Sequence, residues 1–467
     1  MRLAVGFVAA VLLLLVAYFV WSSSTRARLD RRIAELSAAG EPMTIAALQP
    51  KSPDDSVNAM IELAKASVAL NEKTPAWEEL ENLRDAPAIP LQPLERQIIE
   101  KAVAEKQAAL DWLAKAAKKP DAVSDVQLTT PLVNSILPRL NTLRWLARLC
   151  QYAAMHEFDS GRHDAAIERL TPIENIARAG ASHPFLIGAL TAIGCRAIWS
   201  DTLIQFAPDL KIGTQPGDVT PDQLRRTIAQ LLDHRRQVGE YGLAMRGERL
   251  MQLDTFQALA VGSLIVGNAA GPGAIPTART TILAKVARPV IYDNALFCLD
   301  ATTELVPVAE QKDLPAAKAK MAPTTQRVAD TRHRWSKVFA SMLMPPLDRA
   351  FATHFRQRTD ENLAAVALAL RWYQVDHGGK LPERLADLVP DYLPTLPIDL
   401  ISGKPFGYRP GGDDPIVWSV GQDETDDGGS EQPAGRWQYI GDYERWVTKD
   451  AVVHLTRRPR AATQPAD

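Results

Sequence analysis

The sequence predicts a mainly α-helical protein with an N-terminal transmembrane helix and a small C-terminal α+β unit. Three observations carry this prediction. Residues 3–21 form an uncharged, almost wholly apolar run, and residues 94–342 keep the apolar spacing of amphipathic helices. Beyond His377, short apolar segments alternate with turn residues, which is typical of short strands.

The chain of 467 residues is long enough for several structural units. Its 46% hydrophobic and 23% charged residues match ordinary globular proteins. A net charge of −2 leaves no basic excess to neutralise phosphates, so we expect no nucleic-acid partner. Cys150, Cys195 and Cys298 are odd in number and far apart, which fits neither a disulfide framework nor a zinc site.

The first unit is a transmembrane anchor. Residues 3–21 are about long enough to cross a ~30 Å hydrocarbon core, and Tyr18, Phe19 and Trp21 gather at one end as interfacial aromatics do. The alternative is a cleaved signal peptide. Its apolar region is usually shorter, and Trp21-Ser22-Ser23-Ser24 is not a small-x-small cleavage site. The sequence therefore favours an uncleaved anchor, with the membrane as a partner through residues 3–21.

Four units are expected after the anchor at 1–24. Leu29, Ile33 and Leu36 lie at helical spacing and predict a short juxtamembrane helix over 26–39. This helix and a linker make up 25–93. A helical body follows at 94–346, then an α+β unit at 347–456 and a disordered tail at 457–467.

The body is expected to consist of antiparallel helices. One hairpin has an apolar stripe at helical offsets, a turn at Ser160-Gly161 and an Ala-rich second helix from Asp164. It resembles a single tetratricopeptide hairpin, without a second copy at a fixed period. Thr220-Pro221 is a good helix start and predicts a helix to about Ala260. Further helices are expected at 277–306, 323–342 and 347–375. The stripe consists of Leu140, Leu143, Ala147, Cys150 and Ala154.

The C-terminal unit has a recognisable order of features. An apolar helix leads to a turn at 377–380, then to Gly403-Lys404-Pro405-Phe406-Gly407-Tyr408, a strand at 416–419 and an acidic loop. This order resembles the C-terminal half of type II secretion major pseudopilins, which implies a helix packed on a small sheet that ends in a calcium-binding loop. Residues 1–21 contain no acid, unlike prepilins, so we interpret the unit as a pseudopilin-like module fused to a helical body.

The wider layout also carries a resemblance. The apolar span, Gly40-Glu41-Pro42-Met43-Thr44 and His183-Pro184-Phe185-Leu186-Ile187 are similar to a family of uncharacterised bacterial single-pass membrane proteins, which implies an architecture and no activity. It implies a location in the inner (cytoplasmic) membrane. Arg26, Arg28, Arg31 and Arg32 follow the span and favour a cytoplasmic body by the positive-inside rule, whereas the pseudopilin resemblance favours a body outside the cytoplasm. We expect the external orientation.

The acidic loop is the best candidate site. Asp423, Asp426 and Asp427 lie close together among glycines, and calcium takes six to eight oxygens from carboxylates and freed carbonyls. The resemblance places Asp423 at the ligand position of the pseudopilin loop. The next carboxylate that could contribute is the distant Asp442. We predict a calcium site formed by these four residues and no other cofactor; the alternative is a solvated acidic turn without an ion.

No motif names a reaction. The glycine-rich stretch 267–273 lacks the Gly-Lys-Ser/Thr of a phosphate loop, and Pro272 removes a backbone N–H. We find neither a His-Glu-x-x-His nor a Gly-x-Ser-x-Gly sequence. The sequence therefore predicts a membrane-anchored structural or protein-interaction protein, without a catalytic residue that can be named. The alternatives are a hydrolase with its site between the helical body and the C-terminal unit, and a secretion-system accessory factor.

Overall fold

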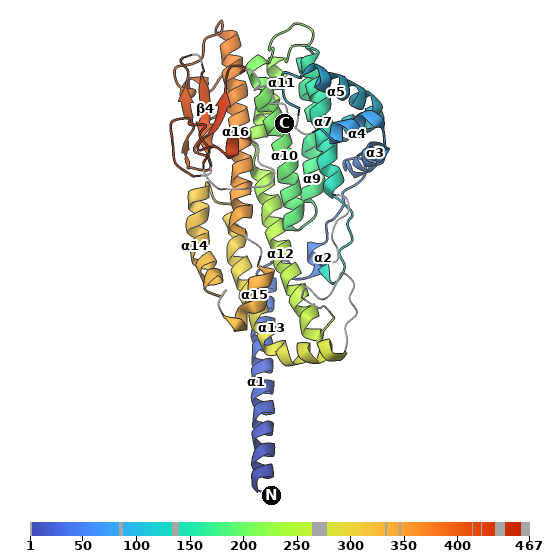
Figure 1. Ribbon diagram of the computed structural model, residues 1–467, viewed down its shortest axis with the longest axis vertical. Coiled ribbons are helices and arrows are strands. Elements are labelled where there is room, and N and C mark those ends of the chain that lie inside the picture. Colours follow the sequence, from blue (N-terminus) through green and yellow to red (C-terminus); the bar gives the residue numbers. More distant parts are fainter. Residues whose placement is uncertain are drawn as a thin grey trace, which may run out of the picture.

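The computed structural model is an elongated helical body from which one long helix projects (Figure 1). It is 66% helix and 5% strand, which confirms the predicted class in its coarse form: mainly helical, with a terminal apolar helix and a small C-terminal sheet. The structure describes residues 2–83, 87–132, 140–263, 278–331, 334–344, 347–412, 414–421, 423–434 and 444–458.

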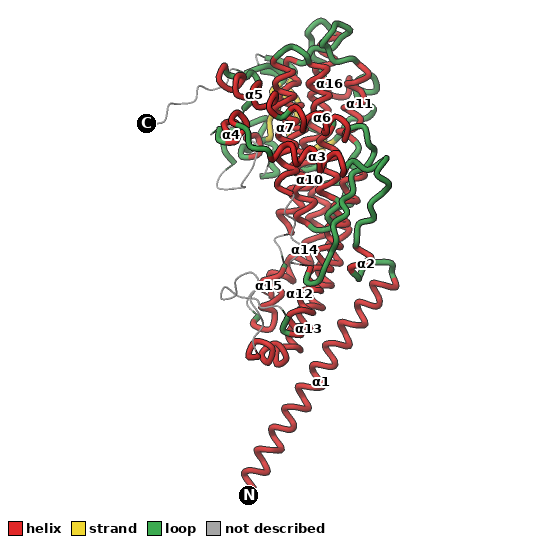
Figure 2. Tube along the Cα trace, turned by 90° about the vertical axis from the view of Figure 1, so that its right-hand side faces the viewer, coloured by secondary structure: helices red, strands yellow, loops and turns green. Residues whose placement is uncertain are grey.

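Helix α1 (Arg2–Ala38) contains both the apolar run and the predicted juxtamembrane helix without a break. The serines at 22–24 leave the helix intact, because serine costs little helix propensity. The second half of α1 packs on α13 (Ala278–Leu305): Leu29 and Leu36 are buried in one apolar cluster with Leu299. The first half projects away from the body (Figure 2).

Short helices cover one side of the body (Figure 1). Most of them share one buried apolar cluster with the first of the long central helices, α7 (Leu140–Asp159), whereas Leu48, in the shortest of them, belongs to the cluster of Leu29 and Leu299. Cis peptide bonds precede Pro90 and Pro131 in the connections of this region. The short helices are α2 (Ile45–Leu48), α3 (Met60–Asn71), α4 (Pro75–Glu81), α5 (Pro93–Glu105) and α6 (Gln107–Ala116).

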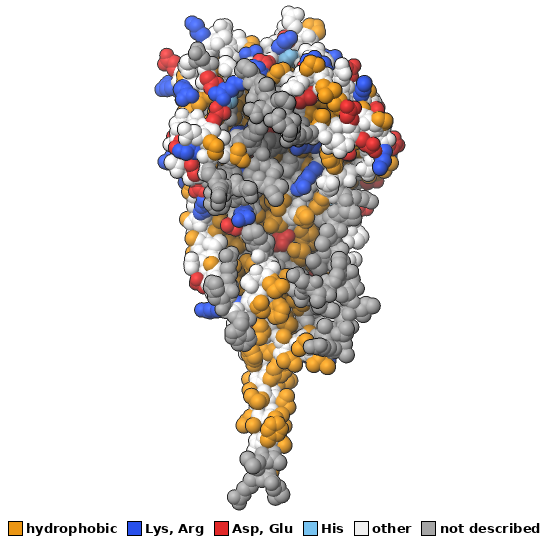
Figure 3. Space-filling view, viewed as in Figure 1, with side chains coloured by type: hydrophobic (Ala, Val, Ile, Leu, Met, Phe, Trp, Pro, Cys, Tyr) orange, Lys and Arg blue, Asp and Glu red, His pale blue; other side chains and the backbone are white. Residues whose placement is uncertain are grey.

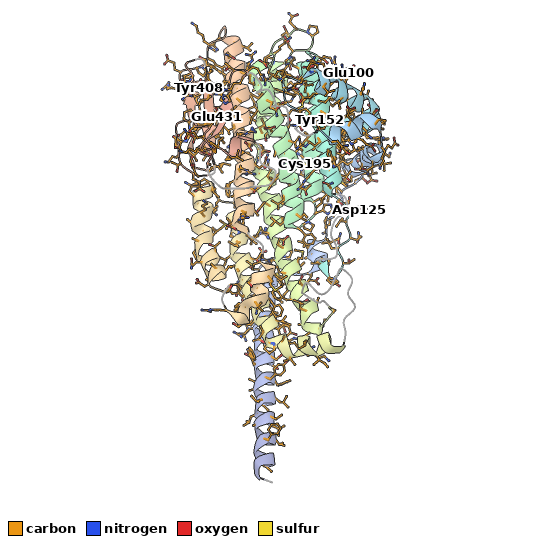
Figure 4. The ribbon with its side chains drawn as sticks, in the orientation of Figure 1. Glu100, Asp125, Tyr152, Cys195, Tyr408 and Glu431 are labelled. Carbon is orange, nitrogen blue, oxygen red and sulfur yellow. The ribbon has the colours of Figure 1, made fainter. Side chains whose placement is uncertain are left out.

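The predicted hairpin is present. Helix α7 turns at Gly161, whose φ of +80° suits glycine, into α8 (His163–Leu170). The chain continues through α9 (Pro172–Ala181) into α10 (Leu186–Phe206). Helix α10 is apolar on most sides and lies at the centre of the bundle, where Figure 4 shows Cys195.

The helix expected from Thr220 to about Ala260 is two helices, α11 (Pro221–Leu232) and α12 (Arg235–Val261). The break lies at Asp233, whose carboxylate accepts hydrogen bonds from the backbone N–H and the side chain of Arg235. Aspartate before the first turn stabilises a new helix start. The Thr220 cap is as predicted: its hydroxyl accepts from the Gln223 N–H at 3.2 Å.

One more predicted helix differs from the structure. The helix expected at 323–342 is replaced by α14 (Leu314–Thr331) and the short α15 (Val338–Leu343). Helix α14 starts earlier because Asp313 caps it, accepting from the Ala316 N–H at 2.8 Å, and Pro323 is tolerated inside the helix. The last helix, α16 (Leu347–Asp376), matches its expected bounds within one residue.

The C-terminal strands form two small antiparallel sheets, β1 (Ile398–Asp399) with β2 (Lys404–Pro405), and β3 (Gly407–Arg409), β4 (Ile416–Ser419) and β5 (Ala451–His454) in the order β3-β4-β5. Val417 of β4 pairs with Tyr408 and Val453. Val417 and Val453 share one buried cluster with Leu363, Val366 and Leu370 of α16. The helix therefore covers the sheet, as the sequence predicts. Short 3-10 helices occupy Ala207–Asp209, Val306–Val308, Trp335–Lys337, Leu385–Leu388 and Glu444–Trp446.

The start of the expected tail is ordered. Arg457 donates to the backbone carbonyls of Ile89 and Gln205 at 3.0 and 2.7 Å and pairs with Asp209. These bonds hold the chain after β5 against the helical body. Residues 459–467 of the expected tail lie outside the described part of the chain.

Candidate functional site

A cleft of about 1070 Å³ lies between α14, α16 and the C-terminal unit. Its apolar lining comes from all three parts, and polar side chains lie among it. Lys318 of α14 pairs with Glu424 of the acidic loop across the cleft. The apolar lining includes Leu305, Leu314, Met321, Met344, Leu347, Ile401 and Trp446, and the polar lining includes Thr324, Thr325, Ser341, Asp348, Arg349, Thr353 and Arg356.

Asp399 fixes the wall that the C-terminal unit contributes. Its side chain is almost fully buried and accepts hydrogen bonds from the Ile401 N–H, the Ser402 hydroxyl and the Ser419 hydroxyl at 2.7–2.9 Å. A buried carboxylate is costly unless several donors satisfy it. These bonds join the loop after β1 to the end of β4, and so place Ile401 at the cleft.

Trp446 closes the cleft from the other side. Its indole N–H donates to both carboxylate oxygens of Asp360 on α16, at 2.9 and 3.0 Å. Arg445 bridges the same Asp360 to Asp201 on α10, at 3.1 and 2.7 Å. Burial raises the pKa of Asp201, and the Arg445 guanidinium opposes that shift. The segment before β5 is thereby tied to two helices of the body.

A buried polar network links α10, α12 and α16 behind the cleft; we call it the polar seam. Arg196 contacts Glu240 at 2.9 Å and Glu174 at 2.9 Å. Fully buried Glu361 accepts two bonds from Gln237 and contacts the His234 ring nitrogen Nδ1 at 3.1 Å. Burial raises the pKa of Glu240, against the effect of Arg196. The seam consists of Glu174, Arg196, His234, Gln237, Glu240, Glu361 and Asn362.

The polar seam also reaches the C-terminal unit. The other ring nitrogen of His234 lies 2.9 Å from the Asn362 amide oxygen, and the Asn362 amide donates to the Ile398 carbonyl at 2.9 Å. Interactions with this many buried partners fix one arrangement of the helices, because any slip would leave buried polar groups unpaired. These contacts hold α16 in one position relative to α12 and to the start of β1.

The three described carboxylates of the predicted calcium site each have a different partner. Asp423 accepts from the Thr425 N–H at 3.1 Å, Asp426 from the Trp418 indole at 3.0 Å, and Asp427 pairs with Lys449 at 3.1 Å. The predicted fourth ligand, Asp442, lies outside the described residues. Among the residues that are described, no three His, Cys, Asp or Glu side chains form a group that could hold a metal ion. Calcium binding here stays a prediction.

Asp450 is the residue of this loop that the sequence analysis missed. It is fully buried at the start of β5 and accepts from the N–H groups of Asp427, Gly429 and Ser430 at 2.8–3.3 Å. Burial raises its pKa, and these backbone donors oppose the shift. Asp450 lies outside the acidic run, so no sequence pattern connected it with this loop. The backbone of the acidic loop is thus shaped by a carboxylate 20 or more residues away.

The side chains that line the cleft indicate which chemistry it can support. Neither histidine nor cysteine occurs among its described lining residues, and the three cysteines are buried elsewhere. The lining combines apolar side chains with hydroxyl and charged groups, a composition that suits binding. No protein-family model matches this chain, and neither a curated protein nor a solved structure is found similar to it.

Proposed function

We propose that the protein is a single-pass, membrane-anchored structural and protein-binding component of the bacterial envelope, with its body outside the cytoplasm. The observation that carries the proposal is the first half of α1. From Val5 onward, its large apolar side chains are exposed, and no part of its most apolar window counts as buried in the described structure. Leaving so many large apolar side chains in water is unfavourable by roughly 1.5–3 kcal/mol each.

A second helix passes the same test of length and apolarity without supporting the proposal. The segment Leu186–Asp209, which includes α10, is 78% buried within the body. Its apolar surface is already covered by α7, α9 and α16. It is the core helix of a globular bundle, and α1 is the candidate span.

The mode of attachment supports a structural role. Because α1 continues without a break from the apolar run into its docked half, the body and the span form one unit instead of two joined by a flexible linker. Arg32 of α1 pairs with Asp300 of α13 at 2.7 Å next to the buried Leu29 and Leu36. A body attached in this way keeps a fixed position relative to the span.

The cleft supports the binding role. Its volume of about 1070 Å³ slightly exceeds the ~300–1,000 Å³ of small-molecule pockets. Its apolar residues come from α14, α16 and the C-terminal unit together. We propose an apolar segment of a partner protein as the occupant. The sequence also leaves open a hydrolase site at this place and a role as a secretion-system accessory factor. The residues described in the cleft lining favour neither alternative.

Site-specific photo-crosslinking in living cells tests the binding role. A photoreactive residue at Thr325 or Ala352, both in the lining, should give an adduct with one defined protein. The same residue at Val68, an exposed position on α3, is the matched control and should not give it. Met321→Glu should abolish the adduct by placing a charge among the apolar side chains that line the cleft. Adducts that are absent from the cleft, or identical at Val68, would contradict the proposal.

A further inference from the structure

The lower end of the body, next to α1, carries exposed apolar side chains. Val261 at the end of α12 is 58% exposed, and on the first turns of α13 Ile282, Leu283 and Val286 are 62%, 59% and 65% exposed. We call these four residues the foot. Figure 3 shows hydrophobic side chains along α1 that continue onto this lower end of the body. Single exposed apolar residues are common, whereas a contiguous group marks an interaction surface.

The foot is built by two helix ends that meet there. Helix α12 ends in Gly262 with a φ of +74°, and the N–H groups of Gly262 and Ser263 bond back to Leu259 and Ala258 at 3.0 Å. Arg288 of α13 donates to the Ala260 carbonyl at 3.0 Å. A cation at this position satisfies an orphan carbonyl and the helix dipole. The end of α12 and the start of α13 are thereby fixed to one another.

Pro289 changes the direction of α13. It lies inside the helix, and a proline there removes one backbone hydrogen bond and kinks the axis. Figure 1 shows the first turns of α13 running across the lower end of the body, while the rest of the helix rises beside α1. Ile282 and Val286 lie one turn apart, and Leu283 is three residues from Val286, so the three share one face of these turns.

The kink is joined to the apolar half of α1. The carbonyl freed by Pro289 is that of Lys285, four residues earlier, and the Tyr18 hydroxyl of α1 donates to it. Tyr18 lies at the aromatic end of the apolar run, three residues before Trp21. Three residues of helix correspond to a rise of about 4.5 Å. The foot is therefore level with the end of the proposed span.

From this geometry we infer that residues 278–288 form an interfacial helix that inserts the foot into the bilayer surface beside α1. The inference rests on the proposed anchoring by α1. A bilayer that covers α1 up to Trp21 reaches Lys285 at the same height, because Tyr18 touches its carbonyl. Interfacial helices bury an apolar face about 5–10 Å deep among the headgroups. Lys285 is exposed on the same turns, where its ammonium can meet anionic headgroups.

Insertion of the foot would attach the body to the bilayer at two places, α1 and the foot. A lone transmembrane helix leaves a protein free to tilt and rotate, whereas packing and interfacial anchors set both. With α1 and the foot in the same bilayer, the cleft would be held in one orientation relative to the membrane surface.

Depth-dependent fluorescence quenching tests this inference on the full chain in vesicles of phosphatidylethanolamine and phosphatidylglycerol. An environment-sensitive dye is attached to a cysteine at Ile282 or Val286, with Val16→Cys on α1 and Val375→Cys at the far end of α16 as controls. All four positions are exposed. The native Cys150, Cys195 and Cys298 are buried, and burial raises the pKa of Cys195 and of Cys298 to about 12, so they should resist labelling. Unchanged helix content shows that each labelled variant is folded.

The inference predicts that lipid-attached quenchers reduce the emission from Ile282 and Val286, with a blue shift, while Val375 is unaffected. Strong quenching at Val16 without quenching at the foot would overturn the inference and leave the proposed anchoring intact. An absence of quenching at Val16 as well would overturn both. A blue shift at the foot without lipid quenching would mean that a second copy of the chain covers it, which also overturns the inference.

Discussion

Gly247 shows how a single residue can decide how two helices cross. A Cβ atom at this position of α12 would overlap the Pro184 carbonyl oxygen in the loop before α10, whereas a Cβ at Gly239 of the same helix meets nothing within 4 Å. The close approach also lets Glu248 reach that loop, where its carboxylate caps α10 by accepting from the Leu186 N–H at 2.8 Å. Glycine is therefore required at one position and dispensable at the other.

The two glycines make a matched pair of substitutions. Gly247→Ala should lower the free energy of unfolding by about 1–3 kcal/mol, because the backbone must shift to admit the methyl group. Gly239→Ala should raise it by about 0.5–1 kcal/mol through helix propensity. Thermal unfolding of the two variants in detergent checks both signs. Equal effects would show that α12 and the loop at Pro184 do not touch.

His183 gives a prediction about pH. It is buried, its Nδ1 nitrogen has no hydrogen-bond partner among the described residues, and burial lowers its pKa to about 4 from an ordinary 6.5. Below pH 6.5 the unfolded chain takes up a proton that the folded chain refuses, so stability should fall with pH down to about 4. The shift corresponds to about 3 kcal/mol in full and about 2 kcal/mol by pH 5. His183→Leu should lose less stability than the parent between pH 7.5 and 5; an equal loss would contradict this assignment.

Calcium binding by Asp423, Asp426, Asp427 and Asp442 can be tested by melting. With few fixed acids the affinity should be weak, on the order of 10⁻⁴–10⁻³ M. Several millimolar calcium should therefore raise the melting temperature of the parent protein relative to chelator, and Asp423→Ala should remove the increase. A melting temperature of the parent that does not respond to calcium would contradict calcium binding and leave the loop as a solvated acidic turn.

Among the elements, helix α16 is the one on which the small C-terminal sheet packs. Leu370 is fully buried in the cluster that holds Val417 and Val453 of the sheet. Leu370→Ala should therefore cost about 2–5 kcal/mol of stability. Val375→Ala, at a position 37% exposed on the same helix, should stay within about 0.5 kcal/mol of the parent. Chemical denaturation of both variants measures the difference; a small loss for Leu370→Ala would mean that α16 does not cover the sheet.

The sequence predicts elements well where one local signal dominates. The Thr220 cap sets the start of α11 correctly, and the apolar period of α16 sets the extent of that helix. It fails where two signals compete. Asp233 splits α11 from α12 against a continuing helical pattern, and Pro323, read as a helix start, lies inside α14. In both cases an aspartate at the helix start accepts a backbone N–H: Asp233, two residues before Arg235, and Asp313, which caps α14. Aspartates are too frequent in the chain to be assigned to helix starts in advance.

At the scale of the whole molecule, the sites come from contacts between distant segments. The cleft joins residues from 305 to 446, and the polar seam joins residues from 174 to 362. Neither has a local pattern, so the sequence alone could not name the residues that form them. The apolar run of α1 is a local pattern and was found. The foot required both the Pro289 kink and the contact between Tyr18 and Lys285, which only the folded chain brings together.

The proposed role and the insertion of the foot both require that α1 crosses a membrane. Alkaline extraction of membranes from cells that produce the full chain, followed by identification of the N-terminal residue, tests this directly. We expect the protein to stay in the membrane pellet and to retain the apolar run at residues 3–21. Release of the body into the soluble fraction with a new N-terminus near residue 24 would contradict it.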